Sequence, residues 1–329
     1  MNKILLSICS LPLFLNCQYK AKEISQENNQ SAYSDTVCFR LATLEEAKKL
    51  MLAEDSYTLN RSSFDIVSRL QNPEGTKEEL VAMSIQELRE WTDEEKEKIR
   101  HLTETINNII RQEQFKLPLP KEIVLVKSTL NDEGGAGGYT RSNWIALTDR
   151  LFTHLPADFH QKLLLHETFH VLTRNSLDFK KKIYETIGFT VIDEELDYPK
   201  DLWDMHISNP DVGRYDSYAT FTVEGKPEKC AMILYADKPY TTGPFFQYMK
   251  VGFVPYDEQM KPKQENGTTI VYPMEKISDF KEKIGENTQY IIHPEEILAE
   301  NFVIAFIDQQ SVPTPELKEK IRKILKGNL

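Results

Sequence analysis

Two histidines and a glutamate stand at a spacing that could hold a metal ion and use it. Residues 163–172 read LLLHETFHVL, which puts His166 and His170 four positions apart with Glu167 beside the first. Residues four apart lie on one face of a helix, so both imidazoles can reach one ion, and neutral imidazole is a good zinc ligand. Glu167 lies too far round the helix to be a natural third ligand. It is well placed to take a proton from a metal-bound water, whose pKa zinc lowers to about 7.

The surroundings of this motif favour a function over coincidence. The three leucines before it, and Phe169, Val171 and Leu172 within and after it, predict a buried helix. Buried histidine and glutamate side chains would need other polar partners if no metal were bound. The alternative is a pair of core histidines whose hydrogen bonds are satisfied within the fold.

A second acidic motif follows far downstream. Residues 293–302 read HPEEILAENF, and Glu296 and Glu300 share one helical face. Together the two motifs resemble the gluzincin group of zincin metallopeptidases, in which a glutamate on a downstream helix completes the zinc site. A metzincin-type site does not fit, because Thr173 and Ser176 stand where that group has a glycine and a third histidine.

The resemblance implies a division of roles among the glutamates. Glu296 would be the third zinc ligand, and Glu300 would accept a hydrogen bond from the second ring nitrogen of a zinc-binding histidine. Glu295 and Glu300 compete with Glu296 for the ligand role. The alternative for all three is an acidic first turn that suits the helix dipole.

The function implied is zinc-dependent hydrolysis of a peptide bond in a peptide or protein substrate, with Glu167 as the general base. The rival interpretation is a catalytically inactive zincin-fold lipoprotein that acts as a binding module. Gluzincins commonly use a tyrosine or histidine to stabilise the oxyanion. The candidates for that role are His206, Tyr215, Tyr218 and Tyr272.

The fold that the resemblance implies is α+β and zincin-like, with a twisted mixed sheet over the helix that carries His166 and His170. An edge strand of that sheet would pair with an extended substrate, and residues 143–147 are expected there. The body would divide into a helical region, 41–115, and a zincin-like domain, 116–329. Residues 210–275 would be a β-hairpin insertion.

Periodicity along the chain supplies the elements. Apolar residues recur at helical spacing in several segments, and short β-branched runs bounded by turn residues predict strands. The glycine-rich residues 134–138 do not form a phosphate-binding loop, because no Gly-Lys-Ser/Thr follows, and a flexible connection is expected. The predicted helices are 43–55, 65–70, 84–91, 93–112, 156–174, 294–309 and 316–325, and the predicted strands are 122–127, 143–147, 218–223, 231–235, 245–254 and 268–272.

The N-terminus is typical of an export signal. A basic Lys3 precedes a short apolar run that ends at Cys17, which resembles a bacterial lipoprotein signal, although Asn16 departs from the small residue usual before the cysteine. We expect a signal peptide over 1–16, lipidation of Cys17, a flexible tether over 17–40, and a lipid anchor at a bacterial membrane, periplasmic or on the cell surface. An ordinary secretory signal is the alternative.

Composition excludes other classes. The chain of 329 residues carries a net charge of -11 without a basic block, so nucleic acid is not an expected partner. After the N-terminus there is no run of about 18 apolar residues, which argues against a polytopic membrane protein. Whether the remaining cysteines, Cys38 and Cys230, form a disulfide stays open.

Overall fold

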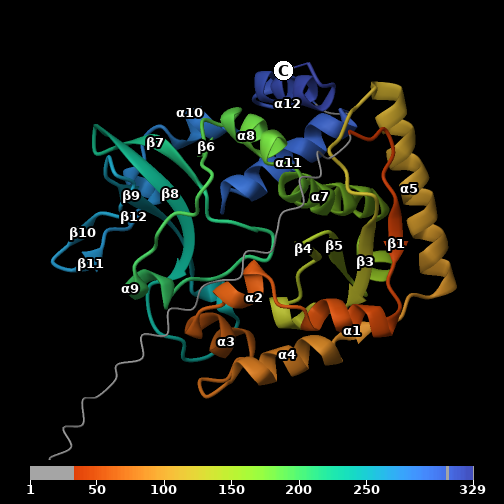
Figure 1. Ribbon diagram of the computed structural model, residues 1–329, viewed down its shortest axis with the longest axis horizontal. Coiled ribbons are helices and arrows are strands. Elements are labelled where there is room, and N and C mark those ends of the chain that lie inside the picture. The colour runs from red at the N-terminus through yellow and green to blue at the C-terminus, as the bar shows by residue number, and fades with distance from the viewer. Residues whose placement is uncertain (1–32, 309–310, 329) are drawn as a thin grey trace, which may run out of the picture. The chain divides into compact units, whose positions relative to one another are not determined.

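A computed structural model describes residues 33–308 and 311–328 of the chain (Figure 1). The predicted signal peptide, the lipidated Cys17 and most of the predicted tether lie outside these residues. Residues 33–40 of that tether belong to the folded body, since Val37 is buried and its backbone exchanges hydrogen bonds with the Asn107 side chain. The polar composition of this segment predicted a tether throughout and gave no sign of these few contacts with the body.

The first sheet is mixed and contains strands from both predicted regions. Its order is β1-β3-β5-β4, with β2 paired to β3; β1 and β5 run parallel to β3, whereas β2 is antiparallel to β3 and β4 to β5. The helical region 41–115 therefore contributes β2 to this sheet, and β1 spans the end of the predicted tether and the first residue of that region. The strands are β1 (Phe39–Leu41), β2 (Leu88–Arg89), β3 (Ile123–Ser128), β4 (Gly138–Arg141) and β5 (Trp144–Thr148).

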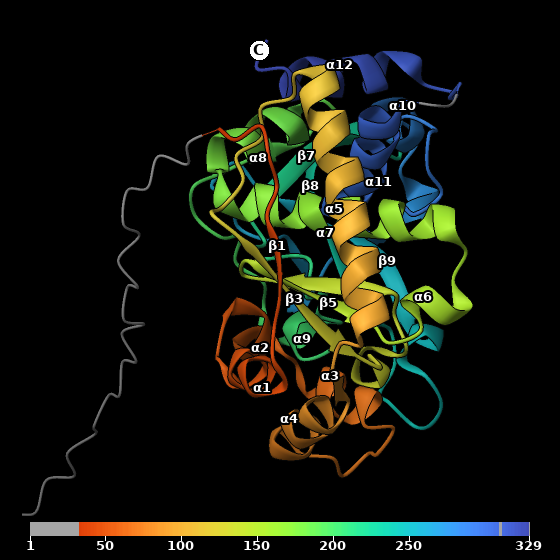
Figure 2. The same cartoon turned by 90° about the vertical axis from the view of Figure 1, so that its right-hand side faces the viewer.

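Helices cover both faces of this sheet, and successive residues of the central strand β3 pack alternately against the helices of one face and of the other. Ile123 and Leu125 join the main core with α5 and α7, whereas Val124 and Val126 pack toward α1 on the other face. Figure 2 shows α5 crossing in front of α7, which it contacts. Strands buried on both faces have continuous apolar runs, as β3 does at residues 123–126.

Side-chain caps begin each of the principal N-terminal helices. A Thr, Asp or Ser immediately before each one accepts a hydrogen bond from a backbone N–H of its first turn, which satisfies a donor that the helix leaves free. These helices are α1 (Leu44–Leu52), α2 (Ser56–Asn60), α3 (Ser63–Arg69), α4 (Lys77–Gln86) and α5 (Asp93–Glu113). The predicted helix over 84–91 is wrong, because α4 ends at Gln86 and Leu88 pairs with Ser128 of β3.

Two buried helices lie at the centre, α7 (Ala157–Asn175) and α11 (Pro294–Ile307). They pack against each other through Phe169 and Phe302, whose ring centroids are 5.5 Å apart. Pro294 opens α11, and the side chain of His293 caps it by accepting from the backbone N–H of Glu295. The shorter helices are α6 (Leu151–His154), α8 (Leu177–Glu185), α9 (Lys200–Trp203), α10 (Phe280–Ile284) and α12 (Pro315–Leu325), with 3-10 turns η1 (Asn131–Glu133), η2 (Phe245–Gln247) and η3 (Met274–Lys276).

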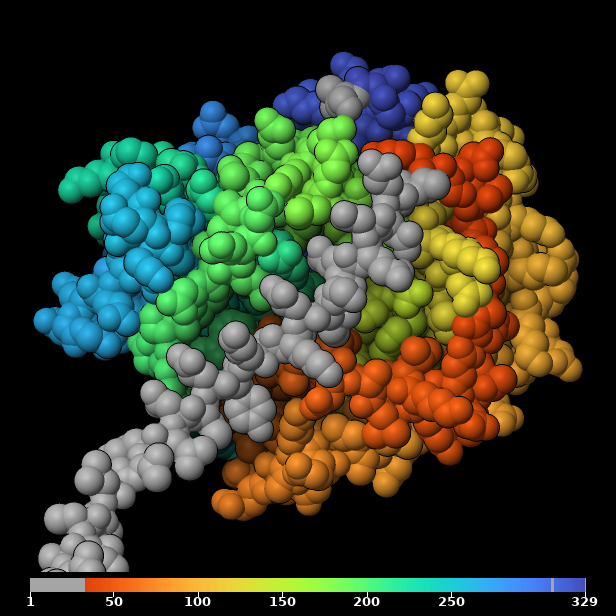
Figure 3. Space-filling model, in the orientation of Figure 1, coloured from red at the N-terminus to blue at the C-terminus, as the bar shows by residue number. Residues whose placement is uncertain are grey.

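The chain between α8 and α11 forms the antiparallel hairpins that the sequence predicts. A second sheet has the order β12-β9-β8-β7-β6, and β10 and β11 make a separate hairpin. In Figure 3 this segment, in teal and light blue, forms a part of the surface distinct from α1–α4 in orange. Its strands are β6 (Thr190–Val191), β7 (Ser217–Val223), β8 (Lys226–Ala236), β9 (Met249–Tyr256), β10 (Gln264–Glu265), β11 (Thr268–Thr269) and β12 (Tyr272–Pro273).

The mixed α+β class is confirmed, but the expected edge strand is wrong. Residues 143–147 form β5, which lies between β3 and β4, and β4 occupies the edge. The reason is the tight β4–β5 hairpin, which folds β4 back along the outer side of β5. Cys38 is exposed, Cys230 is buried in β8, and neither is in a disulfide. Within the described ranges no helix is both long and apolar enough to cross a bilayer.

Candidate metal centre

Helices α7 and α11 bring the two sequence motifs together. His166 and His170 lie one turn apart on α7, with ring centroids separated by 4.9 Å. The Glu296 Oε2 atom on α11 lies 3.1 Å from His166 Nε2 and 3.9 Å from His170 Nε2. One ligand atom from each of the three residues lies within 4.8 Å of the others, so a single cation could contact all three.

A carboxylate orients each imidazole from behind. Glu300 Oε1 lies 2.9 Å from His166 Nδ1, which is the role that the sequence assigned to Glu300. Glu295 Oε1 lies 3.1 Å from His170 Nδ1 and does the same for the second ring. When Nδ1–H donates to a carboxylate, the Nε2 atom is left as the unprotonated nitrogen that can bind a metal.

Glu295 is committed to this orienting role. One of its oxygens also accepts a hydrogen bond of 2.5 Å from Thr173 Oγ1, and the other accepts from the Tyr184 hydroxyl. Glu295 therefore competes poorly for the ion, and the geometry favours Glu296 as the third ligand. From the sequence alone, Glu295 and Glu296 are two adjacent acidic residues in the first turn of a helix, and their roles cannot be distinguished.

His170 Nε2 is the atom that tests whether a metal fits. It is buried and has no hydrogen-bond partner among the described residues. Leaving a buried polar atom unpaired costs about 1–3 kcal/mol, so such atoms usually have a partner or a function. Two imidazole nitrogens and a carboxylate oxygen are ligands that zinc accepts, so the residues present fit that ion.

Electrostatics at the centre depend on the same contacts. Burial opposes ionisation of Glu296, but the two histidines and Asn209 lower the pKa of this carboxyl to about 2. Burial would also lower the pKa of His166, yet its hydrogen bonds with Glu296 and Glu300 raise that pKa well above its usual value. The centre thus stabilises positive charge between the helices.

Glu167 lies on the side of α7 that faces the edge strand. Thr140 Oγ1 of β4 donates a hydrogen bond of 2.8 Å to Glu167 Oε2. Burial and the carboxylate of Asp211 raise the pKa of Glu167 to about 8, against the opposing effect of the two histidines. Gly138 leaves room for this carboxylate, because a Cβ at that position would stand 2.9 Å from Glu167 Oε1 and would displace it.

A loop that the sequence did not single out completes the site. Asn209 Nδ2 donates a hydrogen bond of 2.6 Å to Glu296 Oε1, and Asp211 Oδ1 accepts one of 2.6 Å from the backbone N–H of Thr140. Neither residue belongs to a periodic element or a motif, so no local signal marked them. An acidic or amide residue in a loop far along the chain carries no spacing that points to α7.

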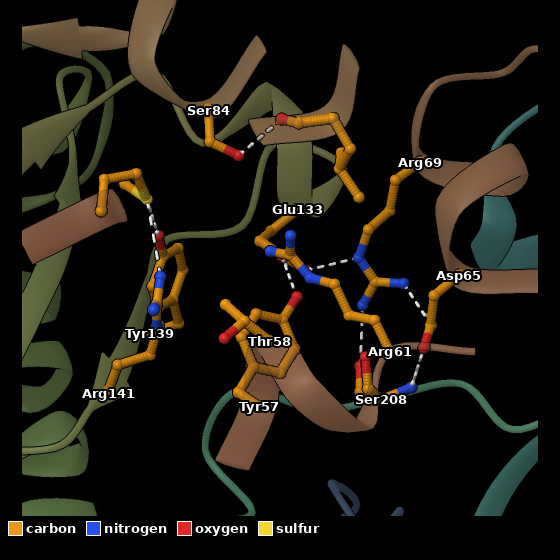
Figure 4. A network of polar contacts seen from close by, with 12 residues as sticks. Tyr57, Thr58, Arg61, Asp65, Arg69, Ser84, Glu133, Tyr139, Arg141 and Ser208 are labelled. Carbon is orange, nitrogen blue, oxygen red and sulfur yellow. Dashed lines mark hydrogen bonds and ion pairs between the residues drawn. The ribbon is translucent and has the colours of Figure 1, made fainter. Parts of the chain in front are cut away.

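Buried charges hold this loop against the helical region (Figure 4). Arg69 of α3 lies between Glu133 and Asp65, with nitrogen–oxygen distances of 3.0 and 2.5 Å. A third guanidinium nitrogen donates 2.7 Å to the backbone oxygen of Ser208, whose N–H donates to Asp65. The network therefore fixes the backbone next to Asn209.

A cavity of about 720 Å³ opens onto the centre. His166, Glu167, Glu296 and Asp211 line it on one side. The glycine-rich segment, expected to be only a connection, contributes residues 136–138 to its wall. Apolar side chains of α7 and α11 line another part, namely Phe159, Leu163, Val303, Ile304 and Ile307. Polar side chains of the two helices, Asp158, Gln161, Lys162 and Glu300, and the aromatic Phe246 and Tyr290 complete the lining.

The sequence candidates for an oxyanion donor are placed elsewhere. His206 Nε2 pairs with the Tyr215 hydroxyl at 2.5 Å, Tyr218 is in β7 and Tyr272 is in β12. None of the four lines the cavity, whereas Tyr290 does, with its ring centroid 6.3 Å from that of His166. Tyr290 lies in the loop before α11 and outside both motifs, which is why the sequence analysis missed it.

No protein-family model, curated protein or solved structure matched this chain when it was compared with each.

Proposed function

We propose that this chain is a zinc-dependent peptide hydrolase of gluzincin type, with His166, His170 and Glu296 as the zinc ligands. The observation that carries the proposal is the unpaired, buried His170 Nε2, which faces the Glu296 carboxylate. Its Nδ1 atom is held by a carboxylate, and so is that of His166. Two core histidines satisfied within the fold would leave no such atom.

The arrangement of elements supports the zincin-like fold within the same proposal. A mixed sheet lies against the helix that carries both histidines, and its edge strand β4 runs beside Glu167. Since the cavity reaches Gly138 of this strand, an extended peptide could add to the sheet edge there.

A bound zinc ion would polarise the scissile carbonyl and make water a better nucleophile at neutral pH. Glu167 takes the proton from the attacking water and later gives it to the leaving amine. Thr140 holds one oxygen of Glu167, so the carboxylate is aimed before substrate arrives. Asn209 fixes the Glu296 oxygen that faces away from the histidines. Tyr290, at the cavity wall, donates a hydrogen bond to the developing oxyanion.

Metal content tests the ligand assignment directly. We expect about one zinc per chain in the purified wild type by mass spectrometry, and almost none in Glu296→Ala, because two imidazoles alone bind zinc weakly. Glu275→Ala, an exposed glutamate on η3, is the matched control and should keep its zinc.

The other outcomes contradict parts of the proposal. Zinc retained in Glu296→Ala would move the third ligand to Glu300. No metal in the wild type would contradict the hydrolase proposal and favour a binding module on the same fold.

Tyr290→Phe is expected to lower kcat about 100-fold while KM changes little, because the lost hydroxyl acts mainly in the transition state. Steady-state kinetics on a cleaved peptide measures both constants. Tyr272→Phe is the matched control, since that tyrosine lies in β12 away from the cavity. Equal kcat values for the two variants would remove Tyr290 from the mechanism.

A further inference from the structure

One carboxylate beside the centre has no role in the hydrolysis as proposed. Asp211 lies in the loop between α9 and β7, is only 9% exposed and lines the cavity. An oxygen of Asp211, an oxygen of Glu167 and a ring nitrogen of His170 all lie within 4.8 Å of one another. Asp211 therefore lies beside the position that the scissile carbonyl and its neighbouring atoms would occupy in a bound substrate.

Only one of its two oxygens is used. Asp211 Oδ1 accepts from the Thr140 N–H, whereas Oδ2 has no hydrogen-bond partner in the part of the chain that the structure describes. A carboxylate needed only to cap Thr140 would not have to be buried at the cavity wall. A nearly buried, half-satisfied carboxylate calls for a donor from the ligand.

The Thr140 contact also limits how a peptide can lie on β4. The Thr140 N–H points away from β5 and toward Asp211. Along an antiparallel strand, every second residue directs its backbone N–H and C=O groups to the same side, so those of Gly138 also point away from β5. The backbone groups of Gly138, which lines the cavity, are available to pair with a substrate. The N–H of Thr140 is not, because it already donates to Asp211. A peptide paired with this edge therefore stops at the Asp211 side.

The charge of the surroundings favours a positively charged group beside Asp211, where the paired peptide would end. Four buried carboxylates gather here, those of Glu167, Asp211, Glu295 and Glu296, and a zinc ion supplies two positive charges. Asp211 itself is only 9% exposed, so its charge is held away from solvent. A positive group that hydrogen-bonds to Asp211 would relieve the cost of burying its charge.

We propose that Asp211 binds the α-ammonium group of the substrate, so that the site removes residues from free peptide N-termini. The inference rests on the proposed hydrolase function and names its substrate class. In the N-terminal residue the ammonium nitrogen is two bonds, or about 2.5 Å, from the scissile carbonyl carbon. A lysine side chain carries its ammonium on a four-carbon stem and would overshoot Asp211.

Binding of small hydroxamates tests this without turnover. A hydroxamate binds the metal, so leucine hydroxamate and Nα-acetyl-leucine hydroxamate differ near Asp211 in whether a free ammonium or a bulkier, neutral amide faces its carboxylate. The Asp211 variant below separates the charge from the bulk. Calorimetry on the zinc-loaded chain should give a Kd about 10- to 100-fold lower for the free amine, as for a hydrogen bond between charged groups. Asp211→Asn keeps an acceptor for Thr140 and should reduce this ratio to near one. Asp93→Asn, on exposed α5, should keep it.

Each contrary outcome is distinct. Equal wild-type affinities for the two hydroxamates would overturn the inference, and this comparison holds even if Asp211→Asn fails to fold. If Nα-acetyl-lysine hydroxamate, in which only the side-chain ammonium is free, binds as tightly as leucine hydroxamate, the inference is also overturned. Asp211 would then bind a side-chain cation and not the α-ammonium group. Failure of all the hydroxamates to bind would contradict the zinc site itself, and the inference would fall with the proposed function.

A peptide digest separates the same cases by product. Peptides with free and acetylated N-termini, followed by mass spectrometry, should differ at least 10-fold in the rate of loss of the first residue. Internal cleavage of both sets at equal rates would support the hydrolase and overturn the role of Asp211.

Discussion

Glu167→Gln is expected to lower kcat about 10²- to 10⁴-fold and leave the zinc content unchanged. Glutamine is nearly the same size and can still contact Thr140, but it cannot accept a proton from water. Burial and Asp211 raise the pKa of Glu167 to about 8 in the metal-free site, and the positive charge of a bound zinc ion would favour the ionised carboxylate that acts as the base. The measurement is peptide cleavage at saturating substrate beside metal analysis of the same sample.

A matched change separates the base from its support. Thr140→Val removes the hydroxyl that holds Glu167 and keeps the side-chain volume, so we expect a smaller loss of kcat than in Glu167→Gln. If Glu167→Gln cleaves peptides as fast as wild type while holding zinc, Glu167 is not the general base and the mechanism is wrong.

Arg69→Met is expected to give the largest loss of stability, about 3–5 kcal/mol in the free energy of unfolding. The guanidinium is buried and lies between Glu133 and Asp65 (Figure 4). Methionine fills much of its volume but leaves Asp65 buried without a cation and Glu133 with only the Arg61 guanidinium, 3.8 Å away. Chemical denaturation followed by circular dichroism measures the change.

Arg100→Met is the matched control for this substitution. Arg100 also pairs with two carboxylates, Glu97 and Glu104, but on the exposed surface of α5, where water screens the charges. Its loss of stability should be far smaller than that of Arg69→Met. Similar losses for both variants would show that the buried network contributes no more than a surface pair.

The same network gives Arg69→Met a second, local effect. Arg69 donates to the Ser208 backbone oxygen, and the next residue, Asn209, donates to Glu296, the proposed third ligand. A shift of this loop should therefore weaken zinc binding in variant protein that is still folded. Arg100 makes no contact with the loop, and its variant should bind zinc as wild type does.

The sequence alone determined those parts of the site that depend on helical spacing. His166 and His170 share a face of α7 because they are four positions apart, and Glu296 and Glu300 share a face of α11 for the same reason. The contact of Glu300 with the Nδ1 atom of His166 could be predicted once the two motifs were assigned to one centre. Strand patterns likewise gave the mixed class and the hairpins between α8 and α11.

Only the tertiary structure decided the rest, because those residues reach the centre through long-range packing. Glu295 differs from Glu296 in direction alone, and that direction is set by Thr173 and Tyr184. The edge position fell to β4 because its hairpin folds back outside β5. Asp211 and Asn209 lie in a loop whose backbone is fixed by buried charges on α3 and η1, and such contacts leave no periodic trace in the sequence.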